Sequence, residues 1–130
     1  RQGERLHIEA LVCPVSRKDG EEKDIYLRAL DRLGEAAPPR AEVYRDWFLR
    51  QWEGAAQLQG VRLLGMGARS RLLRRSHQPD RRLRTVERPQ ALFAAEAVIA
   101  DSARFAELLG RGIGRHRAFG FGMVLLAPQR

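Results

Sequence analysis

The spacing of hydrophobic residues changes along the chain, and this change separates predicted strands from predicted helices. Residues 6–15 are mostly apolar and predict a first strand, followed by a polar turn over residues 16–22. In residues 22–33 the apolar positions recur every three or four residues, which is the period of a helix with one buried stripe. This helix is expected to end at Gly34, before a pair of prolines.

A second helix is predicted over residues 40–53, where aromatic side chains recur at a spacing of four. Tyr44, Phe48 and Trp52 form one row along this helix. An aromatic row at helical spacing belongs to a hydrophobic core more often than to a ligand site, so we expect it to pack inward. A connection over residues 54–60 then leads away from the helix.

Two long strands are predicted over residues 61–75 and 84–100, joined by a turn that contains proline and aspartate. A short helix capped by Asp101 or Ser102 follows, then a glycine-rich loop and a last apolar strand over residues 121–127. The order is β-α-(α)-β-β-α-β, in which split β-α-β units flank a hairpin. The expected fold class is therefore α+β, ferredoxin-like (RRM-like), with an antiparallel sheet in a single domain.

A strong positive charge adds to this picture. The formal net charge is +8, and all but two of the basic residues are arginines. Residues 1–60 carry ten basic and eleven acidic side chains, whereas residues 61–130 carry fourteen and five. Arginine stacks on bases and pairs with phosphate through two hydrogen bonds. The uneven distribution indicates a surface for a polyanion in the second half, whereas the arginine bias of a GC-rich genome would spread evenly.

Several classes of protein are disfavoured by the composition. The single cysteine, Cys13, is expected to be a buried small hydrophobic residue, and alone it builds neither a disulfide framework nor a zinc site. We expect no metal, no cofactor and a reducing, cytoplasmic compartment. No apolar run approaches the ~20 residues of a membrane span, and no signal peptide is visible. The chain enters a strand soon after Arg1, which favours a piece of a longer protein.

Arginines crowd the turn between the two long strands. Residues 69–88 contain eight of them, opposed only by Asp80 and Glu87. Both strands exceed the length of a ferredoxin-like core, so we expect a ribbon that protrudes and carries its charge outward. A polyanion would relieve the repulsion and release counterions. A solvated basic loop without a ligand and a DNA-binding element are the alternatives. The proposed RNA-binding residues here are Arg69, Arg71, Arg74, Arg75, Arg81, Arg82 and Arg84.

A glycine-rich loop, GIGRHRAFGFG, occupies residues 112–122, between the short helix and the last strand. Its glycines permit positive φ and close backbone approach, and successive exposed N–H groups can form an anion-binding concavity. The loop does not match a dinucleotide fingerprint, because Gly112, Gly114 and Gly120 are spaced by two and then six residues. It also precedes a strand, whereas the phosphate loops of nucleotide-binding folds precede a helix. A glycine turn at the helix end is the alternative role for Gly110 and Gly112. The proposed RNA-binding residues are Gly112, Gly114, Arg115, His116, Arg117 and Gly120.

Three histidines are the groups suited to metal-free proton transfer near neutral pH. His7 lies in a predicted strand and is interpreted as structural. His77 lies in the proline-containing turn, where exposure to solvent is expected. His116 is the catalytic candidate best placed by sequence, although a contact with phosphate or a base is the stronger interpretation. The catalytic residues thus stay unknown.

The glycine-rich loop and the apolar strand after it resemble the C-terminal hallmark of the CRISPR repeat-RNA endoribonucleases, most closely the CasE (Cse3) family of type I-E Cascade. The Cys13-Pro14 pair and the segments KDGEEKDIYLRAL and YRDWFLRQW fit the same family. The resemblance implies two tandem ferredoxin-like domains that bind the repeat stem-loop and cut at its 3′ base without metal, leaving a 2′,3′-cyclic phosphate. It further implies retention on the guide RNA as the end subunit of Cascade, in antiviral defence.

The resemblance maps the family's loop onto Gly112, Gly114, Gly120 and Gly122, and its stem-binding hairpin onto residues 69–88. It places the catalytic histidine in an N-terminal domain, so this chain corresponds to the C-terminal half. The implied partners are the repeat or guide RNA stem-loop, the Cascade backbone subunit beside the 3′ hairpin, and the protein's own N-terminal domain. The alternatives are a non-catalytic RNA-binding subunit of a ribonucleoprotein and a ferredoxin-like interaction domain without RNA.

Overall fold

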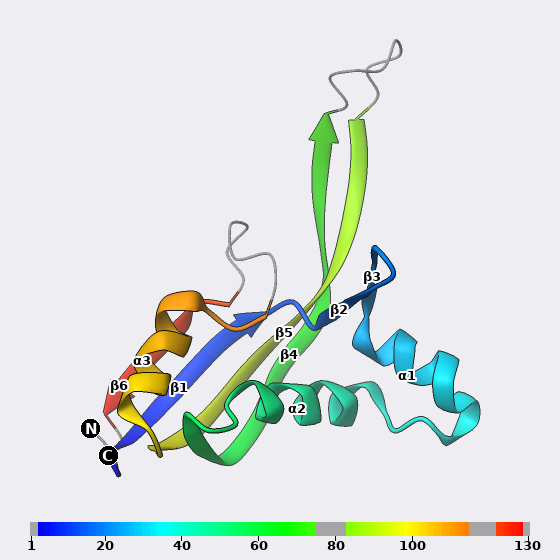
Figure 1. The fold of residues 1–130 in the computed structure, drawn as a ribbon. Helices are drawn as coiled ribbons and strands as arrows, with labels where there is room; N and C mark the ends of the chain where they lie inside the picture. Colours follow the sequence, from blue (N-terminus) through cyan, green and yellow to red (C-terminus); the bar gives the residue numbers. More distant parts are fainter. Residues whose placement is uncertain (1–2, 75–82, 115–121, 129–130) are drawn as a thin grey trace.

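A four-stranded antiparallel sheet forms the centre of the molecule, and the helices lie along one of its faces (Figure 1). The computed structural model describes the backbone of residues 3–74, 83–114 and 122–128. It describes the side chains of residues 3–67, 89–114 and 122–127. Within these residues the chain has the mixed α+β architecture that the sequence predicts.

The sheet order is that of the ferredoxin-like fold. β1 (Arg5–Val12) lies between β5 (Leu83–Ile99) and β6 (Val124–Pro128), and β4 (Ala56–Arg74) pairs with β5 at one edge. All neighbouring strands are antiparallel, as in two interlocked split β-α-β units. The predicted fold class is therefore confirmed. β1 ends three residues earlier than predicted, just before Pro14, which has no backbone N–H to donate to a ladder.

Three predicted helices are present, with ends that differ slightly from the prediction. α1 (Ile25–Leu33) continues into a single 3₁₀ turn at Gly34–Ala36, and α2 (Arg40–Gln51) follows. α3 (Ser102–Arg111) is capped by Asp101, whose carboxylate accepts a hydrogen bond from the N–H of the third residue along. The helices supply the two crossovers of the fold, α1 and α2 before β4 and α3 before β6.

Asp24 determines where the first helix begins and joins it to the second. One carboxylate oxygen accepts a hydrogen bond from the Tyr26 N–H at 2.8 Å and caps α1. The other accepts from Arg40 at 2.6 Å and from the Tyr44 hydroxyl at 2.7 Å. Burial and the hydrogen bond to Asp24 raise the pKa of the Tyr44 hydroxyl. The helix predicted from residue 22 therefore begins at residue 25.

The polar turn predicted over residues 16–22 is confined to Asp19 and Gly20, and the prediction missed the small hairpin that surrounds it. β2 (Val15–Lys18) pairs with β3 (Glu21–Asp24) across a turn at Asp19 and Gly20. Both turn residues have positive φ, 53° and 78°, as a two-residue hairpin turn requires. Polar residues suffice for this hairpin because opposite charges face one another across it, Arg17 with Glu22 and Lys18 with Glu21.

The predicted connection over residues 54–60 is also wrong in part, because β4 already begins at Ala56. Its register against β5 shifts twice, near Gly60 and near Leu64, and each shift leaves one extra residue in β4. Such bulges bend a strand and increase its twist. Gly60 has φ 60°, so this glycine serves a bulge inside a strand.

Beyond the second bulge, β4 and β5 leave the sheet as a two-stranded ribbon (Figure 1). Their pairing continues to Arg74 and Leu83, whereas the described part of β1 pairs with β5 only as far as Ala91. The protruding hairpin predicted from the sequence is thus confirmed. Its described outer part, up to Arg74 and Leu83, carries the positions of Arg69, Arg71, Arg84 and Arg88 away from the core.

The hydrophobic core fills the space between the helices and one face of the sheet. Phe48 of α2 stacks on Phe93 of β5, with ring centroids 4.3 Å apart, and Trp52 is fully buried beside them. The predicted aromatic row of α2 is therefore part of the core, and Cys13 is buried as expected. The sheet contributes alternate residues, namely Ile8, Ala10, Val12, Ala91, Phe93, Ala95 and Ala97.

Two elements are less buried than their sequences suggest. In α1 only Ala29 is buried, and Leu33 of the predicted apolar stripe is 41% exposed. The last strand, predicted over residues 121–127, begins at Val124, and its Leu125 is 62% exposed. β6 lies at the edge of the sheet, so its outer side has no neighbouring strand among the described residues.

Candidate nucleic-acid interface

The structure describes about half of the proposed RNA-binding residues. In the ribbon, the backbone positions of Arg69, Arg71, Arg74 and Arg84 are described. In the glycine-rich loop, Gly112 and Gly114 are described with their surroundings. The remaining proposed residues lie outside the described part of the chain, as does His77: Arg75, Arg81, Arg82, Arg115, His116, Arg117 and Gly120.

The register of the ribbon gathers arginine positions on one face. Arg69 pairs with Arg88, and the pairing of Leu73 with Arg84 lies four residues further out. Directly paired residues share a face of a sheet, and faces alternate along each strand. The positions on this face therefore include Arg69, Arg71, Arg84 and Arg88. Arg74 falls on the opposite face, where the pair of Ser70 with Glu87 also lies.

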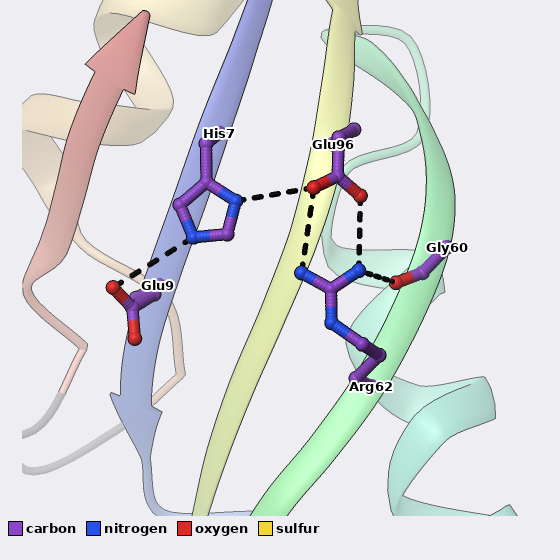
Figure 2. Close-up of polar contacts among 5 residues, drawn as sticks. All are labelled: His7, Glu9, Gly60, Arg62 and Glu96. Atoms are coloured by element: carbon purple, nitrogen blue, oxygen red, sulfur yellow. Dashed lines mark hydrogen bonds and ion pairs between the residues drawn. The ribbon is translucent and has the colours of Figure 1, made fainter. Parts of the chain in front are cut away.

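The same face continues into the sheet and carries the polar cluster of Figure 2. Glu96 of β5 accepts hydrogen bonds from Arg62 at 3.1 and 3.4 Å and contacts the His7 ring at 3.2 Å. The second ring nitrogen of His7 lies 3.7 Å from Glu9. These contacts agree with the structural role expected for His7, and they leave its ring between two carboxylates.

Arg62 fixes the first bulge of β4, inside the four-stranded sheet. The same guanidinium nitrogen that meets Glu96 also donates to the carbonyl oxygen of Gly60 at 2.9 Å (Figure 2). The hydrogen bond from Arg62, followed by that from His7, holds the pKa of the Glu96 carboxyl below its usual value. The cluster therefore keeps Glu96 charged and ties β4 to β5 at the first bulge.

The base of the glycine-rich loop is closed and anchored. The Gly112 N–H donates to the Leu108 carbonyl at 2.8 Å, so Gly112 ends α3, the alternative role considered for it. The fully buried Ile113 donates from its backbone to Gly122 at 3.0 Å. The Gly122 N–H in turn donates to the Leu11 carbonyl of β1 at 2.7 Å. Both ends of the loop are thus held against the end of the central strand.

Trp47 of α2 supports the loop at Gly114. Gly114 has φ 79°, and a Cβ atom built there would lie 3.1 Å from Cη2 and 3.3 Å from Cζ2 of Trp47. A side chain here is therefore disfavoured both by the strained backbone conformation and by the close approach of the indole. The glycine at this position allows the loop to rest directly on the core.

The loop base and the ribbon emerge at the same end of the sheet. Gly122 is bonded to Leu11, and the adjacent Val12 pairs with Ala91, which pairs with Met66 at the start of the ribbon. The backbone ladder therefore brings two segments together that lie about fifty residues apart in sequence. Both segments belong to the half of the chain with the excess of arginine.

Other kinds of site find little support in the described residues. No group of three His, Cys, Asp or Glu residues among them could hold a metal ion. No helix in the described ranges is long and apolar enough to cross a membrane. Sequence reasoning missed Arg62 and Glu96, because only the register places them side by side. It also missed the contact of Trp47 with Gly114, which spacing along the helix does not reveal.

The fold and the paired basic elements define a ferredoxin-like α+β domain with a candidate polyanion surface at one end of its sheet. The model of the CRISPR associated protein family matches residues 1–128. The chain therefore belongs to the CRISPR associated protein family. Among curated protein sequences, none matches the chain.

Several solved structures share the fold at low sequence identity. CRISPR endoribonuclease Cse3 bound to a 19-nucleotide RNA is 21% identical with a TM-score of 0.75, covering 98% of this chain and 58% of that one. Thermus thermophilus Cse3 with an RNA representing a pre-cleavage complex is 20% identical with a TM-score of 0.66, over 98% and 55%. Cas6e from Escherichia coli K-12 is 19% identical with a TM-score of 0.56, over 99% and 63%. The chain thus spans little more than half of these proteins.

Proposed function

We propose that this chain binds the stem-loop of CRISPR repeat RNA and takes part in its metal-independent cleavage to guide RNA. In this proposal it then stays on the 3′ hairpin as a subunit of Cascade. The observation that carries the proposal is the shared location of the ribbon and the glycine-rich loop at one end of the sheet. Family membership and the likeness in fold to RNA-bound Cse3 support it.

The ribbon supplies the grip on the double-stranded stem. Most of its described arginine positions lie along one face. The deep groove of an A-form stem is normally closed to side chains, but a two-stranded ribbon can enter it near a helix end or a loop, where the groove opens. Arginine pairs with phosphate through its planar fork, and each contact releases condensed counterions. The loop adds backbone N–H groups close to the RNA, because its glycines leave no side chains in the way.

Cleavage requires a base at the 2′-OH, an acid at the departing 5′ oxygen and cations around the phosphorane. Among the described residues His7 is the one histidine, and its ring lies between Glu9 and Glu96 on the sheet. We propose that the chain contributes RNA binding and cations, while the base belongs to a further N-terminal domain. The length by which the solved relatives exceed this chain leaves room for such a domain.

Protein partners are proposed at the edge of the sheet. β6 is an edge strand, and its neighbour Met123 is 70% exposed, with Leu125 at 62% and Leu126 at 43%. Exposed edges with apolar side chains tend to be covered in the functional assembly. The N-terminal domain and the neighbouring Cascade backbone subunit are the proposed occupants.

A cleavage assay tests the division of labour. The full-length protein and the 130-residue chain are each incubated with a repeat hairpin in EDTA. We expect the full-length protein to leave a 2′,3′-cyclic phosphate and the chain to bind without cutting. Efficient cutting by the chain would place the base within it. A salt titration addresses the alternative of an interaction domain without RNA, which predicts no salt-dependent affinity for the hairpin.

A further inference from the structure

A hollow of about 320 Å³ lies between α2, α3 and the start of the glycine-rich loop. Its volume is at the lower end of the range of small-ligand pockets. Trp47 and the backbone of Gly112 and Gly114 form part of its lining, with Val15 and Leu108 as apolar neighbours. The hollow therefore adjoins the loop on the side of the helices, away from the open face of the sheet.

Two polar side chains line this hollow, and both offer groups for a ligand. The Gln51 amide nitrogen donates to the Trp47 carbonyl oxygen at 3.3 Å, which holds the side chain in place. Its carbonyl oxygen has no hydrogen-bond partner in the described part of the chain. Arg111, at the end of α3, is exposed and has neither an ion pair nor a hydrogen bond with any described residue. Arg111 also lines two adjoining hollows of about 180 and 310 Å³.

The combination of these groups matches the chemistry of an unpaired nucleotide. A base needs an apolar surface for its faces and an amide for its polar edge, and the phosphate beside it needs a cation. The edges of Trp47 and Leu108, two otherwise buried side chains, supply the apolar surface. Gln51 supplies the amide and the exposed Arg111 the cation. A wholly apolar ligand would make no use of the amide or the guanidinium. A simple anion would make no use of the apolar wall.

We propose that this hollow binds one unpaired nucleotide of the RNA next to the base-paired stem. The inference rests on the proposed function, since the loop that bounds the hollow is proposed to contact the stem. The hollow then determines how the single-stranded flank leaves the protein. It adds a contact outside the ribbon, with specificity for an extruded base and not for the double helix.

The test compares two RNAs and three variants of the full-length protein. One RNA is the bare repeat hairpin, and the other carries unpaired nucleotides on both sides of the stem. Arg111→Ala and Gln51→Ala are expected to weaken binding of the flanked RNA by about tenfold, the scale of one base contact. Affinity for the bare hairpin should change by less than about twofold. Arg50→Ala is the matched control, because Arg50 is an exposed arginine of α2 that does not line this hollow.

Each outcome is decisive. Equal losses on both RNAs would make Arg111 a contact to the stem and overturn the proposal, as would unchanged affinity in both variants. A flanked RNA with 4-thiouridine beside the stem should crosslink to the peptide that contains Trp47 and Gln51, and a crosslink only elsewhere would contradict the site. If the wild-type protein bound neither RNA, the proposed function itself would fail, which is a separate result.

Discussion

At the scale of single residues, the contact between Gly114 and Trp47 links the scaffold to the candidate RNA-binding loop. We predict that Gly114→Ala destabilises the fold by about 1–3 kcal/mol, because the backbone has positive φ and the methyl group would press on the indole. Urea unfolding measures the stability, and hairpin affinity should fall with it because the loop shifts. The hairpin affinity should be measured on folded protein, under conditions well below the unfolding transition.

Gly110→Ala is the matched control for this substitution. Gly110 belongs to α3, has no positive φ, and has open space where its Cβ would lie. Alanine there should be neutral or stabilising by up to about 1 kcal/mol, because glycine is the poorer helix former. A loss of stability at Gly114 no larger than at Gly110 would show that the indole does not constrain the loop.

The sequence identified Gly114 as unusual but could not say why. Glycines at residues 112, 114 and 122 all have positive φ, yet only the structure separates their roles. Gly112 ends a helix, Gly114 accommodates an aromatic ring, and Gly122 lies in a backbone hydrogen-bond chain to β1. The roles of Gly114 and Gly122 depend on contacts with α2 and β1, which lie sixty or more residues away in sequence, and no local pattern encodes such contacts. The role of Gly112 is local, because its partner Leu108 lies four residues before it.

At the scale of elements, the two β-bulges of β4 decide which residues share a face. Each bulge reverses the alternation of β4 relative to β5, so the second restores what the first reversed. The helices and long strands followed from periodicity, which is a local property. The bulges did not follow from periodicity, because the sequence around Gly60 is equally compatible with a connecting loop. The grouping of Arg69 and Arg71 with Arg88 therefore required the observed register.

Arg62 and Glu96 connect these elements, and their electrostatics can be measured. We predict that the Glu96 carboxyl titrates below the usual value of about 4.3 and that Arg62→Ala raises its pKa. A depressed pKa in the folded state favours the carboxylate, so this contribution to stability is present above the unfolded pKa. It is lost as the pH falls through the folded pKa.

NMR titration of the Glu96 side chain provides the measurement. Arg45→Ala serves as the control, because Arg45 is exposed on α2 and the described contacts of Glu96 do not include it. It should leave the Glu96 titration unchanged. If the Glu96 carboxyl titrates at its ordinary pKa in the wild type, or if this pKa does not rise in Arg62→Ala, the contact between Arg62 and Glu96 at the bulge does not persist in solution.

At the scale of the whole molecule, charge and topology act together. The excess of arginine in the second half was visible in the sequence, and so was the ribbon. The convergence of the ribbon and the loop base at one end of the sheet follows from the order β4-β5-β1-β6, which the predicted fold class already implies. What the sequence could not supply is the face on which the arginines lie. A test of where the RNA-binding arginines lie must therefore compare variants that have the same total charge.

Two double variants remove the same charge from different places. Arg69→Ala with Arg71→Ala removes two positions from the arginine-rich face of the ribbon, and Arg45→Ala with Arg50→Ala removes two exposed arginines from α2. We predict that the ribbon variant weakens hairpin binding by about tenfold or more at physiological salt. Its slope of log affinity against log salt should become shallower by about 1.4–1.8, at 0.7–0.9 per lost phosphate contact. The α2 variant should retain the wild-type slope, because its arginines lie away from the proposed stem. Equal changes in both variants would mean that the hairpin responds only to net charge, and the ribbon would then have no place in the interface.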